Sequence, residues 1–484
     1  MQMPVVNDAR RLIRILCGVA RNPSVPMDAV RRLLRLPAAA EQIARRRVDI
    51  TDDLAQAIVD LGDVRAAESL GNNDHLPTGV RWRLVTHPEP SVRASAARHA
   101  IPERVRPGCE VPAAMLTRLA EDPDPQVRAR VAEHASTPED VRARLAADVD
   151  PTVRRTIAEW WKDAPESVRR SLLTDVDADV RAAALSPWHP PPPPDLHAVL
   201  LADEFTRHLT LPHVRLAPAL AAELAASPDD RVRAALAIHP DLPASTREKL
   251  TQDSDPLVRI RLVQNPTTPE AVRVRILASL EAEEGQANRF IIPYFLRNAW
   301  RDKASLGWLW EAPLDERLAY LDSPHAFFRE AVAASPGLPR QAIDRLLADP
   351  DIEVRRIAAK THDAPAQILE QLVRDHGDTM HIRPLLVERP NFPRAAFADF
   401  AVSELPRLRR LALCDKDLPA NLVDLLTSDP EPHVRRAAAE HPNLTVGCLP
   451  ALLTDDDLDV VEAAAAAPLL PADWINRLLT QAEL

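Results

Sequence analysis

Glycine and cysteine are both scarce in this sequence of 484 residues, which has 10 glycines and 4 cysteines. So few glycines leave no glycine-rich phosphate loop, and no P-loop, G-x-S-x-G turn or kinase motif set occurs. Cys17, Cys109, Cys414 and Cys448 are scattered and form no C-x-x-C pair, which argues against a disulfide framework and against a zinc site. We therefore expect no enzyme activity, no metal and no cofactor.

Long apolar runs are also missing. No stretch of 18 apolar residues occurs, so no membrane-spanning helix is predicted. Near the N-terminus Arg14 interrupts the apolar residues, which excludes the core of a signal peptide. Together with the scattered cysteines, this predicts a soluble protein of the reducing cytoplasm. The net charge of −11 argues against a general polyanion binder.

What the chain does contain is a repeated phrase. Between Ala221 and Leu280 an acidic residue, Val-Arg, a small-and-apolar run, His-Pro or Asn-Pro and a second Pro occur twice, with Arg233 and Arg259 26 residues apart. The arginine returns mostly every 26 to 28 residues, and Val461 stands in its place in the last unit. It occurs at Arg65, Arg93, Arg128, Arg154, Arg181, Arg207, Arg233, Arg259, Arg329, Arg355, Arg383, Arg409 and Arg435. A fixed period of this length is typical of repeat proteins.

Each unit predicts two short helices. An acid four residues before the arginine, often followed by Pro, begins the first helix, because a carboxylate caps free N–H groups and Pro fits the first helical position. The His/Asn-Pro step ends it, and a Pro ten residues after the arginine opens the second helix, as at residues 243–251. Such short helices are marginal alone, so neighbouring units must bury one another. We therefore predict an all-α fold, an α-solenoid of about fifteen two-helix repeats.

The repeats divide the chain into a basic N-terminal cap (1–50), an N-terminal array (51–280), an atypical segment (281–328) and a C-terminal array with its cap (329–484). Residues 1–50 hold ten arginines and four acids, which gives this segment a charge of +6. Because the whole chain has a net charge of −11, residues 51–484 carry −17. The phrase Asn22-Pro23-Ser24-Val25-Pro26 matches the repeat turn, so this part is interpreted as a first, modified repeat. We favour a solvated cap on an otherwise acidic protein; the alternative is a basic end that binds nucleic acid, with Arg45, Arg46 and Arg47 as candidate contacts, or an acidic partner.

Aromatic residues provide the other candidate sites. They gather in residues 281–328, where they either fill a wide gap between helices, which we favour, or bind a partner, and where a bend is expected. Trp160-Trp161 poses the same choice, with gap filling again favoured over stacking on a base or partner. The candidate partner contacts are Tyr294, Trp300, Trp308, Trp310, Trp160 and Trp161. The five prolines at 190–194 do not alter the repeat spacing, so we interpret them as a rigid turn rather than a ligand for an aromatic groove.

Two recurring polar patterns are interpreted as structural. His99, His134, His213, His239 and His441 each stand six residues after an arginine, and Asn265 takes the same place, which indicates a turn position rather than a metal site. The acid four residues before each arginine can pair with it on one helix, and stacked units could extend such pairs into a ladder.

The phrases Asp122-Pro123-Asp124-Pro125-Gln126-Val127-Arg128 and His239-Pro240-Asp241-Leu242-Pro243 resemble the leucine-rich repeat variant family, over most of residues 51–280 and 329–484. The resemblance implies a right-handed superhelix akin to armadillo and HEAT arrays, with one helix of each unit often in 3₁₀ form. It implies no general catalytic activity. A founding type of that family carries an iron–sulfur cluster on clustered N-terminal cysteines, and with only Cys17 in this region the cluster is not expected.

Two functions remain open from the sequence. The first is a non-catalytic scaffold whose curved face binds an unidentified protein or peptide. The second is a nucleic-acid-binding HEAT-like protein with a DNA-glycosylase-like groove that uses the basic N-terminal segment. The net charge disfavours the second function, so nucleic acid is an unexpected partner.

Overall fold

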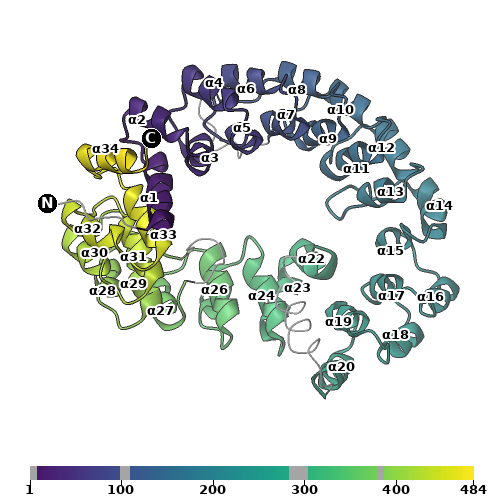
Figure 1. Ribbon diagram of the computed structural model, residues 1–484. Helices are drawn as coiled ribbons and strands as arrows, with labels where there is room; N and C mark the ends of the chain where they lie inside the picture. Colours follow the sequence, from purple (N-terminus) through teal and green to yellow (C-terminus); the bar gives the residue numbers. More distant parts are fainter. Residues whose placement is uncertain (1–7, 99–108, 283–302, 379–385) are drawn as a thin grey trace. The chain divides into compact units, whose positions relative to one another are not determined.

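The protein is an α-solenoid of stacked helix pairs (Figure 1). The computed structural model describes residues 8–98, 109–282, 303–378 and 386–484. In these ranges the regular secondary structure consists of α-helices and short 3₁₀-helices, with no strand. The chain forms two compact units: unit 1 comprises Met1–Leu145 and Leu369–Leu484, and unit 2 comprises Ala146–Ile368. The predicted fold class is therefore confirmed.

In unit 1 the helices form two layers. Layer A consists of the helices that carry the Val-Arg phrase or its equivalent, and layer B of the helices that follow them. Layer A contains α29 (Pro406–Ala412), α31 (Pro432–Ala439), α33 (Leu458–Ala465), α1 (Ala9–Arg21), α3 (Pro37–Arg46), α5 (Val64–Gly71), α7 (Pro90–Ala96) and α9 (Pro125–Glu133). Layer B contains α27 (Ala366–His376), most of which belongs to unit 1, α28 (Ala396–Ala401), α30 (Ala420–Leu426), η6 (Val446–Cys448) with α32 (Leu449–Leu453), α34 (Ala472–Gln481), α2 (Met27–Leu33), α4 (Asp52–Asp60), α6 (Thr78–Leu84), α8 (Ala113–Leu119) and α10 (Glu139–Leu145).

Unit 2 repeats the arrangement. Its layer A contains α11 (Pro151–Trp160), α13 (Ala178–Ala183), α15 (Arg207–Thr210) with η3 (Leu211–His213), α17 (Asp230–Ala237), α19 (Pro256–Gln264), α22 (Lys303–Glu311), α24 (Ala326–Ala334) and α26 (Ile352–Thr361). Its layer B contains α12 (Glu166–Leu173), η2 (Pro194–Leu196) with α14 (His197–Ala202), α16 (Pro218–Leu224), α18 (Ala244–Leu250), α20 (Glu270–Ala282), α23 (Leu314–Ala319) with η5 (Tyr320–Asp322) and α25 (Arg340–Leu347). Because α22 contacts both α19 and α24, the described part of residues 281–328 contains an ordinary repeat. The predicted bend stays a prediction, since residues 283–302 lie outside the described ranges.

Most layer A helices begin where the sequence predicts, but α15 begins at Arg207 rather than directly after Asp203. Asp150 precedes α11, with Pro151 at its first position, and its carboxylate accepts from the Thr152 N–H at 2.8 Å. The same side-chain cap occurs at Asp124, Asp177, Asp229, Asp255, Asp351 and Asp457. Glu89 and Glu431 stand at the same place but make no side-chain cap. Arg65 is out of register: it follows the cap residue Asp63 by two positions rather than four, and its side chain is exposed.

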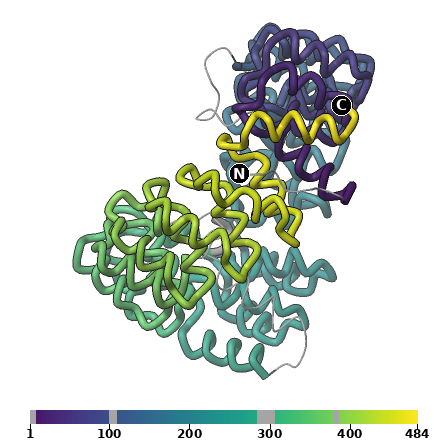
Figure 2. The backbone as a smooth tube through the Cα atoms, turned by 60° about the vertical axis from the view of Figure 1, so that its left-hand side comes forward, coloured from purple at the N-terminus to yellow at the C-terminus, as the bar shows by residue number. Residues whose placement is uncertain are grey.

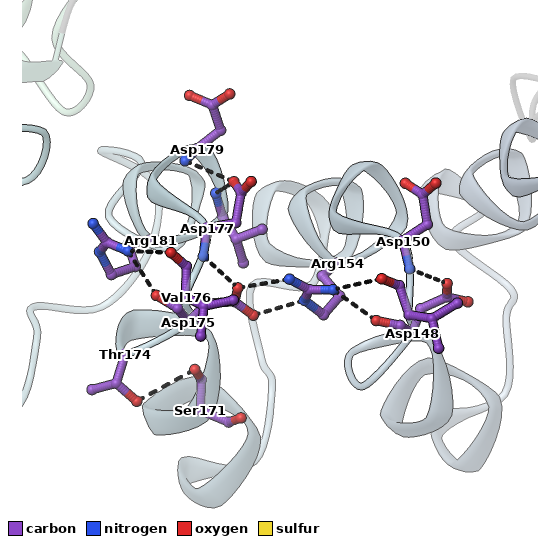
Figure 3. Close-up of polar contacts among 12 residues, drawn as sticks. Asp148, Asp150, Arg154, Ser171, Thr174, Asp175, Val176, Asp177, Asp179 and Arg181 are labelled. Atoms are coloured by element: carbon purple, nitrogen blue, oxygen red, sulfur yellow. Dashed lines mark hydrogen bonds and ion pairs between the residues drawn. The ribbon is translucent and has the colours of Figure 1, made fainter.

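In the repeats whose ion pairs are described below, the arginine does not pair with the acid four residues before it, so the predicted pairing within one helix is wrong for these repeats. It reaches the next repeat instead (Figure 3). Arg154 donates from Nε and Nη2 to the carboxylate of Asp175, both at 2.8 Å, while the Asp175 carbonyl accepts from Arg181 Nη1 at 2.7 Å. One aspartate thus ties two repeats together. Equivalent pairs are Arg93–Asp122, Arg181–Asp203, Arg233–Asp253, Arg329–Asp349, Arg409–Asp429 and Arg435–Asp455.

A second inter-repeat bond comes from the His/Asn position. Asn265 donates through Nδ2 to the His239 carbonyl at 2.9 Å, and its Oδ1 accepts from the Thr267 N–H at 2.8 Å. His239 does the same with its ring: Nε2 donates to the Val214 carbonyl at 3.0 Å and Nδ1 accepts from the Asp241 N–H at 3.0 Å. Either Asn or His can occupy this position of the repeat, because each side chain offers a hydrogen-bond donor and an acceptor. We call Asn22, Arg47, Asn73, His239, Asn265 and His441 the clamp residues.

The N-terminal helices of unit 1 stack on the C-terminal ones. Figures 1 and 2 both show the purple α1 beside the yellow α33, and the two helices pack directly together. Gly18 permits the contact, because a Cβ there would lie 2.3 Å from the Glu462 carbonyl oxygen. The helices α1 and α3 of the predicted N-terminal cap segment therefore lie between α33 and α5. We call the α33–α1 interface the joint.

The joint uses the same bonds as the other repeats. Asn22 donates to the Ala467 carbonyl at 2.7 Å, as a clamp residue does to the repeat before it. Val461 lacks the guanidinium that would bind the Asp455 carbonyl, and Arg11 of α1 supplies one, with Nη1 2.5 Å from that oxygen. In this sense the chain continues from its last repeat into its first.

Candidate functional site

Three adjoining cavities lie along layer A of unit 1, across the joint. Each is lined only by layer A helices and by the residues that follow them in the chain. The apolar cavity, about 710 Å³, is formed mainly by Ala439, Ala463, Ala466, Pro468 and Leu469, with Arg21 at its edge. Because both ends of the chain line it, this cavity depends on the joint.

The middle cavity is small, about 190 Å³, and is lined entirely by polar and charged side chains. It shares Arg21 with the apolar cavity and Arg46 with the third cavity. Its charges are paired across the joint: Glu462 accepts from Arg14 Nη1 at 2.6 Å and from Arg21 Nη1 at 3.1 Å. The Glu462 side chain is only 12% exposed, so these ion pairs are partly shielded from solvent.

The third, basic cavity has a volume of about 670 Å³. It is lined by α3, α5, the turn after α5 and Arg98, two residues beyond the end of α7. The lining residues are Glu41, Arg45, Arg46, Arg65, Glu68, Ser69, Asn72, Asn73, Asp74, His75 and Arg98. The clamp residue Asn73 fixes its floor, because it donates to the carbonyls of Ala44 and Arg47 at 2.9 and 2.8 Å. Partial burial of its guanidinium, and then the positive charges of Arg45 and Arg21, lower the pKa of Arg46, although the residue as a whole is exposed. An anionic group placed here would relieve that repulsion.

Many arginines of the basic N-terminal segment bind acids or carbonyl groups of the chain itself. Arg11, Arg14 and Arg21 bind acids or carbonyls across the joint, and Arg32 donates to the Leu484 carbonyl. Arg47 is 2% exposed, pairs with Asp49 at 2.6 Å and donates to the Asn22 carbonyl at 2.9 Å. Of the three predicted nucleic-acid contacts, Arg45 and Arg46 are exposed and line the basic cavity. Arg47 is buried, and its guanidinium binds other residues of the chain.

The predicted aromatic contacts separate into packed and exposed residues. Trp161 is 6% exposed, and Trp308 packs edge-on against Tyr320, with ring centroids 5.5 Å apart. Trp160 and Trp310 are 57% and 40% exposed. Tyr294 and Trp300 lie outside the described residues, as does His99. All described members of this set belong to unit 2, so none lines the cavities of unit 1.

The prolines at 190–194 form a connection between α13 and η2, held by hydrogen bonds from neighbouring side chains. Arg169 donates to the carbonyls of Pro190 and Pro191, and His197 Nε2 donates to the Pro192 carbonyl at 3.0 Å. With their carbonyls engaged by the chain itself, these prolines match the rigid-turn interpretation.

Neither a metal site nor a membrane span is found in the part of the chain that the structure describes. No group of three or more His, Cys, Asp or Glu side chains there is placed to hold a metal ion. None of the helices in the described ranges combines the length and apolar character needed to cross a membrane. The imidazoles of His239 and His441 form hydrogen bonds with backbone groups, which gives these two histidines a structural role.

Comparisons with solved structures give several similar chains. The chain is similar to a leucine-rich repeat variant. That structure, described as a variant with a novel repetitive protein structural motif, is 23% identical, with a TM-score of 0.31, and the match covers 51% of this chain and 88% of the other. The karyopherin Kap121p bound to Nup53p is 12% identical (TM-score 0.24, 98% of this chain), and Kap121p bound to the C-terminus of the phosphatase Cdc14p is 13% identical (TM-score 0.23, 99% of this chain).

This chain spans about half the length of the two Kap121p structures, 51% and 52%. No family model matches the sequence. A comparison with curated protein sequences gives no match either. Since the TM-scores are low, the fold assignment depends on the stacked repeats themselves, and these likenesses say nothing of a partner.

Proposed function

We propose that the protein is a non-catalytic interaction scaffold that binds a protein or peptide along layer A of unit 1. The observation that carries the proposal is the line of three adjoining cavities, which share Arg21 and Arg46. A stack of repeats presents successive helices at regular spacing, so it can contact an extended partner at several points. Cys17, Cys109, Cys414 and Cys448 form no disulfide bond, which is compatible with the predicted reducing cytoplasm; that location stays a prediction.

The rigid inter-repeat bonds support a binding role. The side chains that line the cavities project from helices fixed by buried clamps and ion pairs, so a partner need not order them. Trp160 and Trp310 of unit 2 are exposed aromatics and offer a separate surface, but no cavity of unit 1 involves them.

Photo-crosslinking in the native host tests the proposal. A photoreactive amino acid is placed at Gln42, which lines the middle cavity, and in a second variant at Leu425 of layer B, which is 55% exposed. We expect Gln42 to yield a discrete crosslinked protein or peptide and Leu425 to yield none. Equal yields at both positions, or none at either, would show that layer A of unit 1 is not the binding surface.

A further inference from the structure

The charges that line the three cavities are unevenly satisfied. Nearly every acid has an arginine partner: Glu41 with Arg65, Asp74 with Arg98, Glu440 with Arg436, Asp459 with Arg14, and Glu462 with Arg14 and Arg21. Glu68 is the exception among the acids. Among the arginines, by contrast, neither Arg45 nor Arg46 has an ion-pair partner in the described residues, although both line the basic cavity.

Arg46 therefore stands beside two further cations, Arg45 and Arg21, without a bound carboxylate, and its pKa is lowered by burial and by those charges. Two neighbouring arginines without an ion-pair partner in the chain are suited to bind a carboxylate of another molecule through both of its oxygens. At the other end of the line, the apolar cavity offers Ala463, Ala466 and Leu469 to an uncharged side chain.

We infer that the three cavities bind one extended acidic peptide segment, with a carboxylate against Arg45 and Arg46 in the basic cavity and an apolar side chain in the apolar cavity. The inference rests on the proposed scaffold function and names the chemistry of its partner. The joint is part of the site, since Arg21 and Gln42 come from the first repeats and Leu469 from the last.

The spacing of the helices sets the length of the segment. From α33 through α1 and α3 to α5 there are three helix-to-helix steps, and packed helices lie about 8–10 Å apart. The segment must therefore span roughly 25–30 Å, which an extended chain covers with about eight residues at about 3.3 Å each. An acidic residue and an apolar residue near opposite ends of an octapeptide satisfy both cavities.

A peptide fits this surface better than a nucleic acid does. The line of cavities contains six acids beside its seven arginines, and a phosphate backbone would meet Glu68, Asp459 and the other carboxylates at every step. A single peptide carboxylate needs only the local excess at Arg45 and Arg46. The net charge of −11 acts in the same direction, because it repels a polyanion as a whole.

Fluorescence anisotropy with the full chain and defined probes tests the inference. The probes are labelled octapeptides with Leu at one end, Asp-Asp at the other and Gly/Ser between them, in both directions, and matched peptides with Asn-Asn in place of Asp-Asp. The variant Arg45→Glu/Arg46→Glu is compared with Arg31→Glu/Arg35→Glu, which makes the same charge change on exposed arginines of α2 and the turn after it, away from the cavities. Circular dichroism confirms that each variant is folded.

We expect the Asp-Asp probe to bind about tenfold more tightly than the Asn-Asn probe, a preference that the Arg45/Arg46 variant removes and the Arg31/Arg35 variant retains. Leu469→Ser should weaken the Leu-containing probe alone. An equal affinity for both probes, an equal effect of both double variants, or stronger binding of an oligonucleotide or of inorganic phosphate would overturn the inference. A partner crosslinked at Gln42 that carries no acidic segment would overturn it too, while leaving the scaffold function in place.

Discussion

Replacing Asp175 with Asn tests the bond that holds consecutive repeats together. The Asp175 carboxylate receives Nε and Nη2 of Arg154 at 2.8 Å, and the two side chains are only 10% and 13% exposed. Breaking a buried pair from one side costs about 3–5 kcal/mol, because the remaining charge is left without compensation. Arg154 retains its bond to the Asp148 carbonyl and some contact with water, so we expect a loss of about 2–3 kcal/mol in unfolding free energy.

Asp150→Asn is the matched control. It makes the same chemical change in the same repeat, but Asp150 serves only as a helix cap and Asn caps as well as Asp, so we expect a change below about 0.5 kcal/mol. Hydrogen exchange of peptides from α11 and α13 reports the local effect, and urea unfolding reports the global one. The reasoning fails if Asp175→Asn and Asp150→Asn behave alike.

The pH dependence of the same variant supplies a second check. Burial by itself would raise the pKa of Asp175, but hydrogen bonds from Arg154 and the Asp177 N–H outweigh it, and the pKa is lowered. A carboxyl with a lower pKa in the folded state stabilises the fold above its unfolded pKa, about 4, and that stabilisation is lost as the pH falls through the folded value. The stability difference between wild type and Asp175→Asn should therefore be full near neutral pH and shrink below about pH 4.

Three further predictions concern other contacts. Asn265→Ala should cost about 2–3 kcal/mol, because it leaves the carbonyls of Ala237 and His239 without their buried donor, whereas Asn265→His should cost distinctly less; urea midpoints that are equal for the two would contradict the clamp role. Glu462→Gln should speed hydrogen exchange in both α1 and α33, because it weakens the bonds to Arg14 and Arg21; faster exchange in only one of these helices would argue against the joint. Trp308→Ala should destabilise by about 3 kcal/mol because its ring packs on Tyr320 and Phe328, while Trp310→Ala, which removes an exposed ring, should have little effect on thermal unfolding.

The sequence by itself determined the repeating unit and its helices. Local signals decide where a short helix begins and ends, and these signals lie within a few residues of each other, as with Asp150 and Pro151 before α11. The same local reasoning identified His239 and Asn265 as turn residues. It also predicted, from Asn22-Pro23, that the basic first segment is a modified repeat.

Only the tertiary structure decided which residues meet across repeats. The partner of Arg154 is Asp175 rather than Asp150, because the guanidinium reaches the neighbouring repeat while the nearer carboxylate is already occupied by the helix start. The pairing of Arg11 with the Asp455 carbonyl, and of Asn22 with Ala467, joins residues more than 440 positions apart. No local propensity encodes such a contact, because the two residues belong to repeats that are far apart in the sequence. The missing arginine at Val461 was visible in the sequence, but its replacement from α1 became recognisable only when the two ends were placed side by side.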